Sequence, residues 1–264
     1  MEPQLDNLIA TVESKPEVFS LLVLRHRLRL SNHVVACCQG KVARGHFTGM
    51  ILPTATGGWG DADRGAMALG LYEQEVLDLI TQYAIPGCTF INLGAADGYY
   101  GIGMLRSGIA SSAYCFEMDD TARAKLIQHA RTNGVADRLK VFGKADDRFF
   151  ERLDPQQAGR AFILCDIEGA EFDVFPSADA FLRFKDSHIV IEIHDWSDEL
   201  KQRTQKLVSD ASQTHRPTFF RTSSRDLSGI DLLKDLDDTT RWLICSEGRP
   251  KLMEWCHLKP LSQV

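Results

Sequence analysis

The pattern from Cys88 onward is the feature that most constrains how this chain can fold. Short apolar runs of strand length alternate there with amphipathic segments of helical period, which is typical of a mainly parallel sheet with helices on both faces. In an open sheet of this kind ligands bind beyond the carboxyl ends of the strands, so candidate functional residues are sought there. The expected strands are Cys88–Leu93, Ala113–Phe116, Leu139–Phe142, Ala161–Cys165, Ile189–Ile193, Thr218–Arg221 and Trp242–Cys245. The expected helices are Tyr99–Arg106, Thr121–Asn133, Phe172–Phe184 and Asp198–Ser212.

The residues before this region have a different pattern. Residues 1–68 combine apolar residues at helical spacing with a glycine-rich stretch, which predicts a helical and irregular N-terminal extension. We expect this extension to cap the site or to form a homodimer contact. The α/β domain is expected to span residues 69–250, with an amphipathic helix from Leu69 to Ile80 at its start, and residues 251–264 are expected to form a C-terminal tail.

Charge and composition exclude several classes of protein. The 264 residues carry 30 Lys and Arg against 36 Asp and Glu, a net charge of −6, whereas a general nucleic-acid binder usually has the opposite balance. The longest apolar run, Phe19 to Leu24, is far shorter than the ~20 residues of a membrane span. No signal peptide is visible, and the 7 cysteines are an odd number, which fits reduced thiols. We therefore expect a cytoplasmic protein with no nucleic-acid partner and no membrane span.

A glycine turn follows the first expected strand. Gly94 and Gly98 let the backbone bend and let a ligand approach closely. The second and third glycines of a dinucleotide-binding turn are replaced by Ala96 and Tyr99. Asp97 adds a carboxylate that would repel a pyrophosphate. The turn therefore favours a ligand with positive charge and no phosphate, such as S-adenosylmethionine.

The second and third strands end in further acidic residues. Glu117 lies about 20 residues after Gly94, where a carboxylate accepts the hydrogens of both ribose hydroxyls in nucleoside-binding proteins. Its neighbour Met118 is expected to contact the cofactor as well. Ala145 and Asp146 follow the third strand. For Asp146, a hydrogen bond from the adenine amino group and a plain surface turn both remain open.

Carboxylates are most concentrated after the fourth strand, in the stretch Asp166-Ile167-Glu168-Gly169-Ala170-Glu171. The fifth strand ends near His194, and alternation places Glu192 and His194 on one face. Three interpretations remain open. His194 can act as a general base on a substrate hydroxyl. Asp166, His194 and Asp195 can hold a divalent ion. The group can also be a structural network that ties two strands together.

Four motifs point to a family. They are Gly70-Leu71-Tyr72-Glu73, Asn92-Leu93-Gly94-Ala95-Ala96-Asp97-Gly98-Tyr99-Tyr100, Phe116-Glu117 and Asp166-Ile167-Glu168-Gly169-Ala170-Glu171. In this order they resemble the FkbM-type S-adenosylmethionine-dependent methyltransferases, over roughly Leu69 to Asp195. The resemblance implies a Rossmann-like class I methyltransferase fold, with a seven-stranded, mostly parallel sheet whose last strand is antiparallel. It also implies that Glu117 contacts the ribose and that the methionine part of the donor is contacted by Gly94, Ala95, Asp97 and Gly98.

Members of this family commonly methylate hydroxyl groups of natural products, sugars or lipid-linked glycans. This chain departs from the family at Asn92, where Asp is frequent, and at Asp97, where Asn or a small residue is common. We expect an O-methyltransferase that converts S-adenosylmethionine to S-adenosylhomocysteine, with a small-molecule or glycan acceptor. Asp166 is the expected cofactor contact nearest the reaction, and His194 and Asp166 are the expected catalytic residues. The alternatives are an NAD(P)-dependent oxidoreductase and a non-catalytic binding protein that keeps the fold.

Overall fold

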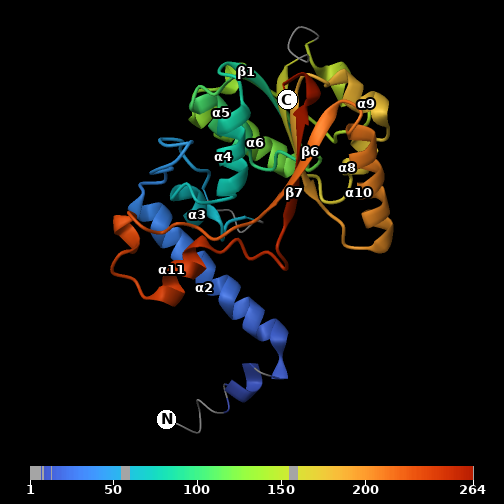
Figure 1. The fold of residues 1–264 in the computed structure, drawn as a ribbon. Helices are drawn as coiled ribbons and strands as arrows, with labels where there is room; N and C mark the ends of the chain where they lie inside the picture. The colour runs from blue at the N-terminus through green and yellow to red at the C-terminus, as the bar shows by residue number, and fades with distance from the viewer. Residues whose placement is uncertain (1–6, 8, 13, 55–59, 155–159, 264) are drawn as a thin grey trace.

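Seven strands form one sheet in the order β3-β2-β1-β4-β5-β7-β6 (Figure 1). The computed structural model describes residues 7, 9–12, 14–54, 60–154 and 160–263, so residues 1–6, 8, 13, 55–59 and 264 of the expected extension and tail lie outside the description. Strands β1 to β5 pair in parallel, and β7 is antiparallel to both β5 and β6. This confirms the Rossmann-like class I methyltransferase fold. The strands are β1 (Cys88–Leu93), β2 (Ala110–Phe116), β3 (Leu139–Phe142), β4 (Ala161–Cys165), β5 (His188–Ile193), β6 (His215–Arg221) and β7 (Glu254–Pro260).

Helices cover both faces of the sheet, as the alternation predicts. Figure 1 shows α4 (Gln74–Tyr83), α5 (Tyr99–Arg106) and α6 (Asp120–Thr132) on one side, and α8 (Glu171–Val174), α9 (Ala178–Arg183) and α10 (Asp198–Ala211) on the other. Successive residues of a strand enter opposite cores. In β1, Phe90 belongs to the core under α4 and α5, and Ile91 to the core under α9 and α10. All six residues of β1 are buried, as in other strands covered on both faces.

The expected seventh strand is wrong. Trp242–Cys245 lies in helix α11 (Asp238–Cys245), because the Asp237 carboxylate accepts a hydrogen bond from the backbone N–H of Thr240 at 3.0 Å and caps the helix. The seventh strand is β7, within the residues 251–264 that were expected to be a tail. Its side chains enter both cores, with Trp255 on one face and Cys256 on the other. A strand buried on both faces lacks the apolar–polar alternation that marks an exposed strand.

Other boundaries also differ from expectation. Phe172–Phe184 is two short helices, α8 and α9, because Pro176 lies between them and cannot continue a helix. The helix expected from Leu69 begins only at Gln74, after a turn at Gly70. Pro217 lies in β6, which is an edge strand of the sheet, where a missing N–H donor is tolerated.

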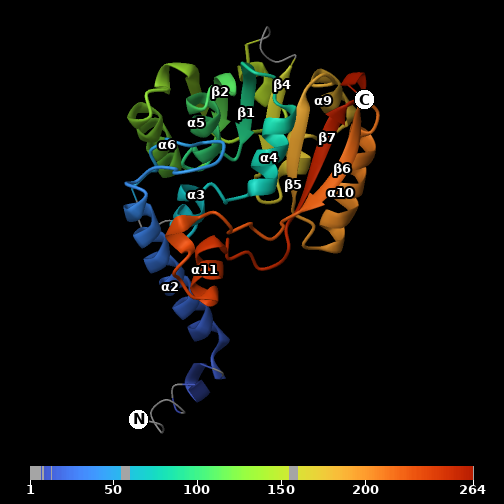
Figure 2. The same cartoon turned by 60° about the vertical axis from the view of Figure 1, so that its left-hand side comes forward.

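The N-terminal extension packs against the C-terminal part of the chain. Its helix α2 (Pro16–Cys37) contacts α3 (Arg64–Ala68) and α11. The buried Arg27 forms an ion pair with Asp63 at 2.5 Å and donates to the backbone carbonyl of Ser246. Figure 2 shows the first half of α2 projecting away from the rest of the molecule. None of the helices in the described part of the chain has the length and apolarity needed to cross a lipid bilayer.

Candidate functional site

The glycine turn and the acidic stretch meet at the carboxyl edge of the sheet. Gly94, directly after β1, has a φ of 84°, and a β-carbon there would stand 1.7 Å from the backbone carbonyl oxygen of Asp166. The hydrogen bonds between β1 and β4 continue to this point, because the backbone N–H of Asp166 donates to the backbone carbonyl of Leu93 at 2.9 Å. Only glycine fits this close approach of two strand ends. The expected donor-binding turn and the expected catalytic stretch are therefore immediate neighbours.

Glu117 lies against the glycine turn. Its carboxylate accepts hydrogen bonds from the N–H groups of Ala96 at 2.9 Å and Asp119 at 2.8 Å. Ala96 is held in the left-handed region at a φ of 46°. This carboxylate therefore joins the turn between β1 and α5 to the end of β2, together with the backbone N–H groups of Gly94 and Ala95, which both donate to the carbonyl of Phe116 at 2.9 Å. Its contact with a ribose stays a prediction.

Asp97 is turned toward the N-terminal extension. Burial raises the pKa of its carboxyl group, which the charges of His129 and Arg64 partly offset. The backbone carbonyl of Asp97 lies 2.9 Å from Nδ1 of His129, and Nε2 of the same ring lies 2.7 Å from the carbonyl of Ile51. Asp97 thus links the glycine turn to residues before the sheet. It is not part of the acidic group around Asp166.

The remaining expected cofactor contacts lie around the ends of β2 and β3. Met118 is 72% exposed beside Glu117. Ala145 is buried in the core shared with Phe116 and Phe149. The Asp146 carboxylate accepts a hydrogen bond from the N–H of Arg148 at 2.9 Å and stabilises a surface turn.

His194 is the centre of the acidic group. Its side chain is 1% exposed, and its Nδ1 lies 2.8 Å from a carboxylate oxygen of Glu171. Its Nε2 faces three other carboxylates, those of Glu192 at 3.4 Å, Glu168 at 3.5 Å and Asp166 at 3.8 Å. The same oxygen of Glu171 also accepts from the N–H of Gly169 at 3.1 Å. The loop after β4 and the end of β5 therefore close around one imidazole ring.

The charges around His194 determine its protonation. Burial lowers its pKa, but hydrogen bonds to Glu171 and Glu192 and their charges prevail and raise the pKa to about 10. At neutral pH the ring is an imidazolium, so it has no free lone pair with which to accept a proton. Burial and the neighbouring Glu192 raise the pKa of Asp166 well above its usual range. His194 thus has the protonation state of a hydrogen-bond donor.

Asp195 lies apart from this group, since it forms an ion pair with Lys251 at 3.0 Å. Glu192 takes the place that the sequence analysis gave to Asp195. Ligand atoms of Asp166, Glu192 and His194 all lie within 4.8 Å of one another. These residues fit the donor set of a divalent ion, since they offer two carboxylates and one imidazole nitrogen. The other imidazole nitrogen is held by the carboxylate of Glu171.

A buried ionic network that the sequence analysis missed extends this group. Arg249 pairs with Glu192 at 2.6 Å, with Glu247 at 2.8 Å and with Glu73. Burial raises the pKa of Glu73 to about 7 against the opposing charge of Arg249, and the hydroxyl of Tyr100 donates to this carboxylate. Gly70-Leu71-Tyr72-Glu73 was noted only as a motif. Arg249 follows a lone glycine in an irregular segment and carries no sequence signal of its own.

No family model matches the sequence, and no curated protein matches it. Solved structures resemble it in fold. A putative precorrin-6Y C5,15-methyltransferase domain from Corynebacterium diphtheriae is 19% identical over 72% of this chain and 98% of that chain, with a TM-score of 0.44. A putative rRNA methylase from Clostridium thermocellum is 11% identical over 70% and 96%, with a TM-score of 0.46. The tRNA methyltransferase TrmK from B. subtilis is 12% identical over 69% of this chain and 64% of its own length, with a TM-score of 0.44.

Proposed function

We propose that this chain is an S-adenosylmethionine-dependent methyltransferase that transfers the methyl group to a hydroxyl of a sugar, glycan, lipid or natural product. The observation that carries the proposal is the contact between Gly94 and the carbonyl of Asp166. Through this contact the glycine turn after β1, which resembles a nucleoside-binding turn, lies directly beside the acidic residues around His194 at the carboxyl edge of the sheet. The resemblance to the FkbM family supports a hydroxyl acceptor.

The electrostatics of the site favour a cationic donor. The network around His194 and Arg249 contains more carboxyl groups than cationic groups. S-adenosylmethionine carries an ammonium and a sulfonium, which such a site attracts, whereas the phosphates of a dinucleotide would be repelled. The carboxyl groups are those of Glu73, Glu75, Asp166, Glu168, Glu171, Glu192 and Glu247, and the cations are Arg225, Arg249 and the imidazolium of His194.

In the proposed reaction, Glu117 and the glycine turn hold the donor, and the acceptor oxygen displaces the sulfur in line. Alignment of the two reactants supplies most of the acceleration, an effect of up to about 7–11 kcal/mol. The acceptor hydroxyl loses its proton to the ionised form of Asp166. Because burial and Glu192 raise the pKa of this carboxyl group, the population of the ionised form, and with it turnover, should rise with pH. His194 acts as a positioning residue that fixes Asp166, Glu192 and Glu171 around one positive charge. This assigns proton acceptance to Asp166 and revises the expected role of His194.

A transfer assay tests the proposal. Purified protein is incubated with methyl-labelled donor and a panel of hydroxylated sugars, glycans and lipids, with Asp166→Asn as the matched control. Label in the ether-linked methyl of one acceptor, lost in the control, is the expected result. Equal labelling by the control removes Asp166 from the reaction. Oxidation of added NADH by one of the acceptors, with no transfer of the methyl label, would indicate the oxidoreductase alternative.

The geometry of His194 supports a second way to activate the acceptor. Glu171 fixes Nδ1, and Nε2 faces Asp166 and Glu192. These three residues would hold a divalent ion if its binding displaced the Nε2 proton of His194, and the ion would lower the pKa of the acceptor hydroxyl. Titration of metal-stripped protein with Mn²⁺, followed by electron paramagnetic resonance, tests this. Binding that His194→Gln abolishes supports the ion, and the absence of binding to the unaltered protein excludes Mn²⁺ from this site.

A further inference from the structure

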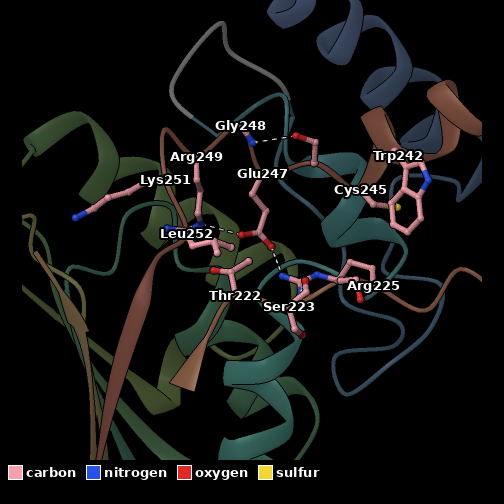
Figure 3. A pocket seen from close by; sticks show the side chains of 12 residues that line it. Thr222, Ser223, Arg225, Trp242, Cys245, Glu247, Gly248, Arg249, Lys251 and Leu252 are labelled. Atoms are coloured by element: carbon pink, nitrogen blue, oxygen red, sulfur yellow. Dashed lines mark hydrogen bonds and ion pairs between the residues drawn. The ribbon is translucent and has the colours of Figure 1, made fainter. Parts of the chain in front are cut away.

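A cavity of about 420 Å³ lies between the end of β6, helix α11 and the segment that leads into β7 (Figure 3). Its size is that of a small-molecule site. Thr222, Ser223, Arg225 and Trp242 are among the residues that line it. Thr222, Ser223 and Trp242 have no role in the proposed reaction. The sequence analysis expected a strand and the start of a tail in this part of the chain.

The cavity adjoins the acidic group through Arg249. This residue lines the cavity and donates to one oxygen of Glu192 at 2.6 Å. The other oxygen of Glu192 lies 3.4 Å from Nε2 of His194. One guanidinium group therefore separates the cavity from the place where the acceptor would react.

The cavity wall contains polar groups that lack partners. The side chain of Arg225 is 5% exposed, and its terminal nitrogens form ion pairs with Glu75 and Glu247, each at 2.5 Å. Its Nε–H has no hydrogen-bond partner among the described residues, and neither does the Thr222 hydroxyl within that part of the chain. Buried donors without partners are costly. Both atoms are themselves shielded from solvent, so a ligand in the cavity would form its hydrogen bonds with other groups of the wall, such as the exposed Ser223.

The charges of the wall favour a neutral ligand. Glu247 lies between Arg225 and Arg249 and pairs with both (Figure 3). Lys251 at the rim pairs with Asp195 at 3.0 Å. An anionic ligand would compete with these carboxylates for each cation. A neutral, hydroxyl-rich molecule can form hydrogen bonds to the wall without breaking the ion pairs.

An aromatic ring completes the site. Trp242 is 47% exposed although it lines the cavity, and Leu252, which also lines it, is 68% exposed. An indole face offers a large apolar surface with a polar edge, which suits a ring that has apolar C–H faces and polar hydroxyls. We propose that this cavity binds a neutral pyranose ring, the non-reacting part of the acceptor. Its role as an acceptor subsite rests on the proposed function, whereas binding of the sugar does not.

Saturation-transfer NMR tests the subsite. The probes are the methyl glycosides of α-D-glucose, α-D-mannose and α-D-galactose, each added to the full chain with S-adenosylhomocysteine present. We expect binding of at least one glycoside, weakened about fivefold to tenfold by Trp242→Ala. We expect Ser223→Ala, which removes a hydroxyl from the exposed part of the wall, to weaken it about threefold to tenfold. Phe219→Ala is the matched control, since Phe219 is 45% exposed on β6 and does not line the cavity.

Three outcomes would overturn the inference. These are no binding of any of the three glycosides, equal binding by the cavity variants and the control, and displacement of the glycoside by inorganic phosphate. Calorimetric titration of S-adenosylhomocysteine into the same samples separates the two proposals. If the nucleoside binds and no glycoside does, the subsite fails alone. If a glycoside binds in the cavity and the nucleoside does not, the proposed function fails and the sugar site stands.

Discussion

The backbone carbonyl oxygen of Asp166 lies where a β-carbon of residue 94 would have to be, with a separation of only 1.7 Å from its ideal position. Gly94 directly follows β1 and Asp166 directly follows β4, so this contact joins two neighbouring strands at the edge where ligands bind in open sheets. This close approach of two backbone segments fixes the distance between the turn that would hold the donor and the acidic group that would activate the acceptor.

Gly94→Ala is expected to lower the free energy of unfolding by about 2–4 kcal/mol, because the residue has both a positive φ and a backbone neighbour that cannot yield. Binding of S-adenosylhomocysteine should be lost with it. Gly134→Ala is the matched control, since Gly134 has a φ of 67° and open space around it. That change should cost about 1–2 kcal/mol and leave nucleoside binding intact. Denaturant unfolding and calorimetry on both variants check this; equal effects would contradict it.

Glu117→Ala is expected to weaken donor binding by about 1.5–3 kcal/mol, through the loss of charged hydrogen bonds to the ribose. The same change releases the N–H groups of Ala96 and Asp119. Glu117→Gln keeps an acceptor oxygen for the turn, so it separates the two effects. Calorimetric titration with S-adenosylhomocysteine measures both variants. Unchanged affinity in Glu117→Ala would remove Glu117 from the donor site.

The imidazolium of His194 makes stability depend on pH. Its pKa is about 10 in the folded chain and about 6.5 in the unfolded chain. Between these two pKa values the folded chain keeps a proton on His194 that the unfolded chain loses. The stabilisation from this proton is complete below pH 6.5 and is lost as the pH rises toward 10. The difference in unfolding free energy between the unaltered protein and His194→Gln should therefore shrink over this range. His46→Gln is the control, because His46 pairs with Asp78 at the surface. A difference independent of pH would contradict the imidazolium.

Asp166→Asn is expected to reduce turnover by about 10²–10⁴-fold if the carboxylate accepts the acceptor's proton. The affinity for S-adenosylhomocysteine should change little, since the backbone contact with Gly94 remains. Asp173→Asn is the matched control, because Asp173 pairs with Arg203 on the surface of α8. Rates and affinities measured together decide the role. Equal losses of turnover and nucleoside affinity would indicate a donor-binding role instead.

Patterns among residues close in sequence predicted which residues lie at the carboxyl edge of the sheet, whereas the roles of these residues in binding and catalysis stay predictions. The pattern of strand, glycine turn and helix located Gly94 and Gly98, and the ends of β2, β4 and β5 located Glu117, Asp166 and His194. Strict alternation in β5 also placed Glu192 beside His194. These inferences rest on periods of a few residues, which the sequence displays directly.

Long-range contacts could not be read in the same way. Arg249 reaches Glu192 across 57 positions and Glu73 across 176 positions, and nothing local marks it as the partner of either. The protonation state of His194 could not be predicted either. It depends on the carboxylates of Glu171 and Glu192, which come from two separate segments of the chain. Trp242–Cys245 was misread because an apolar run of four residues fits a strand as well as one helical turn.

The most direct test of the central claim is calorimetric titration of the purified protein with S-adenosylmethionine and S-adenosylhomocysteine, with NADH as the control ligand. The account predicts micromolar binding of both nucleosides, loss of that binding in Gly94→Ala, and no binding of NADH. Binding of NADH alone, or no nucleoside binding by a folded and stable protein, would contradict it.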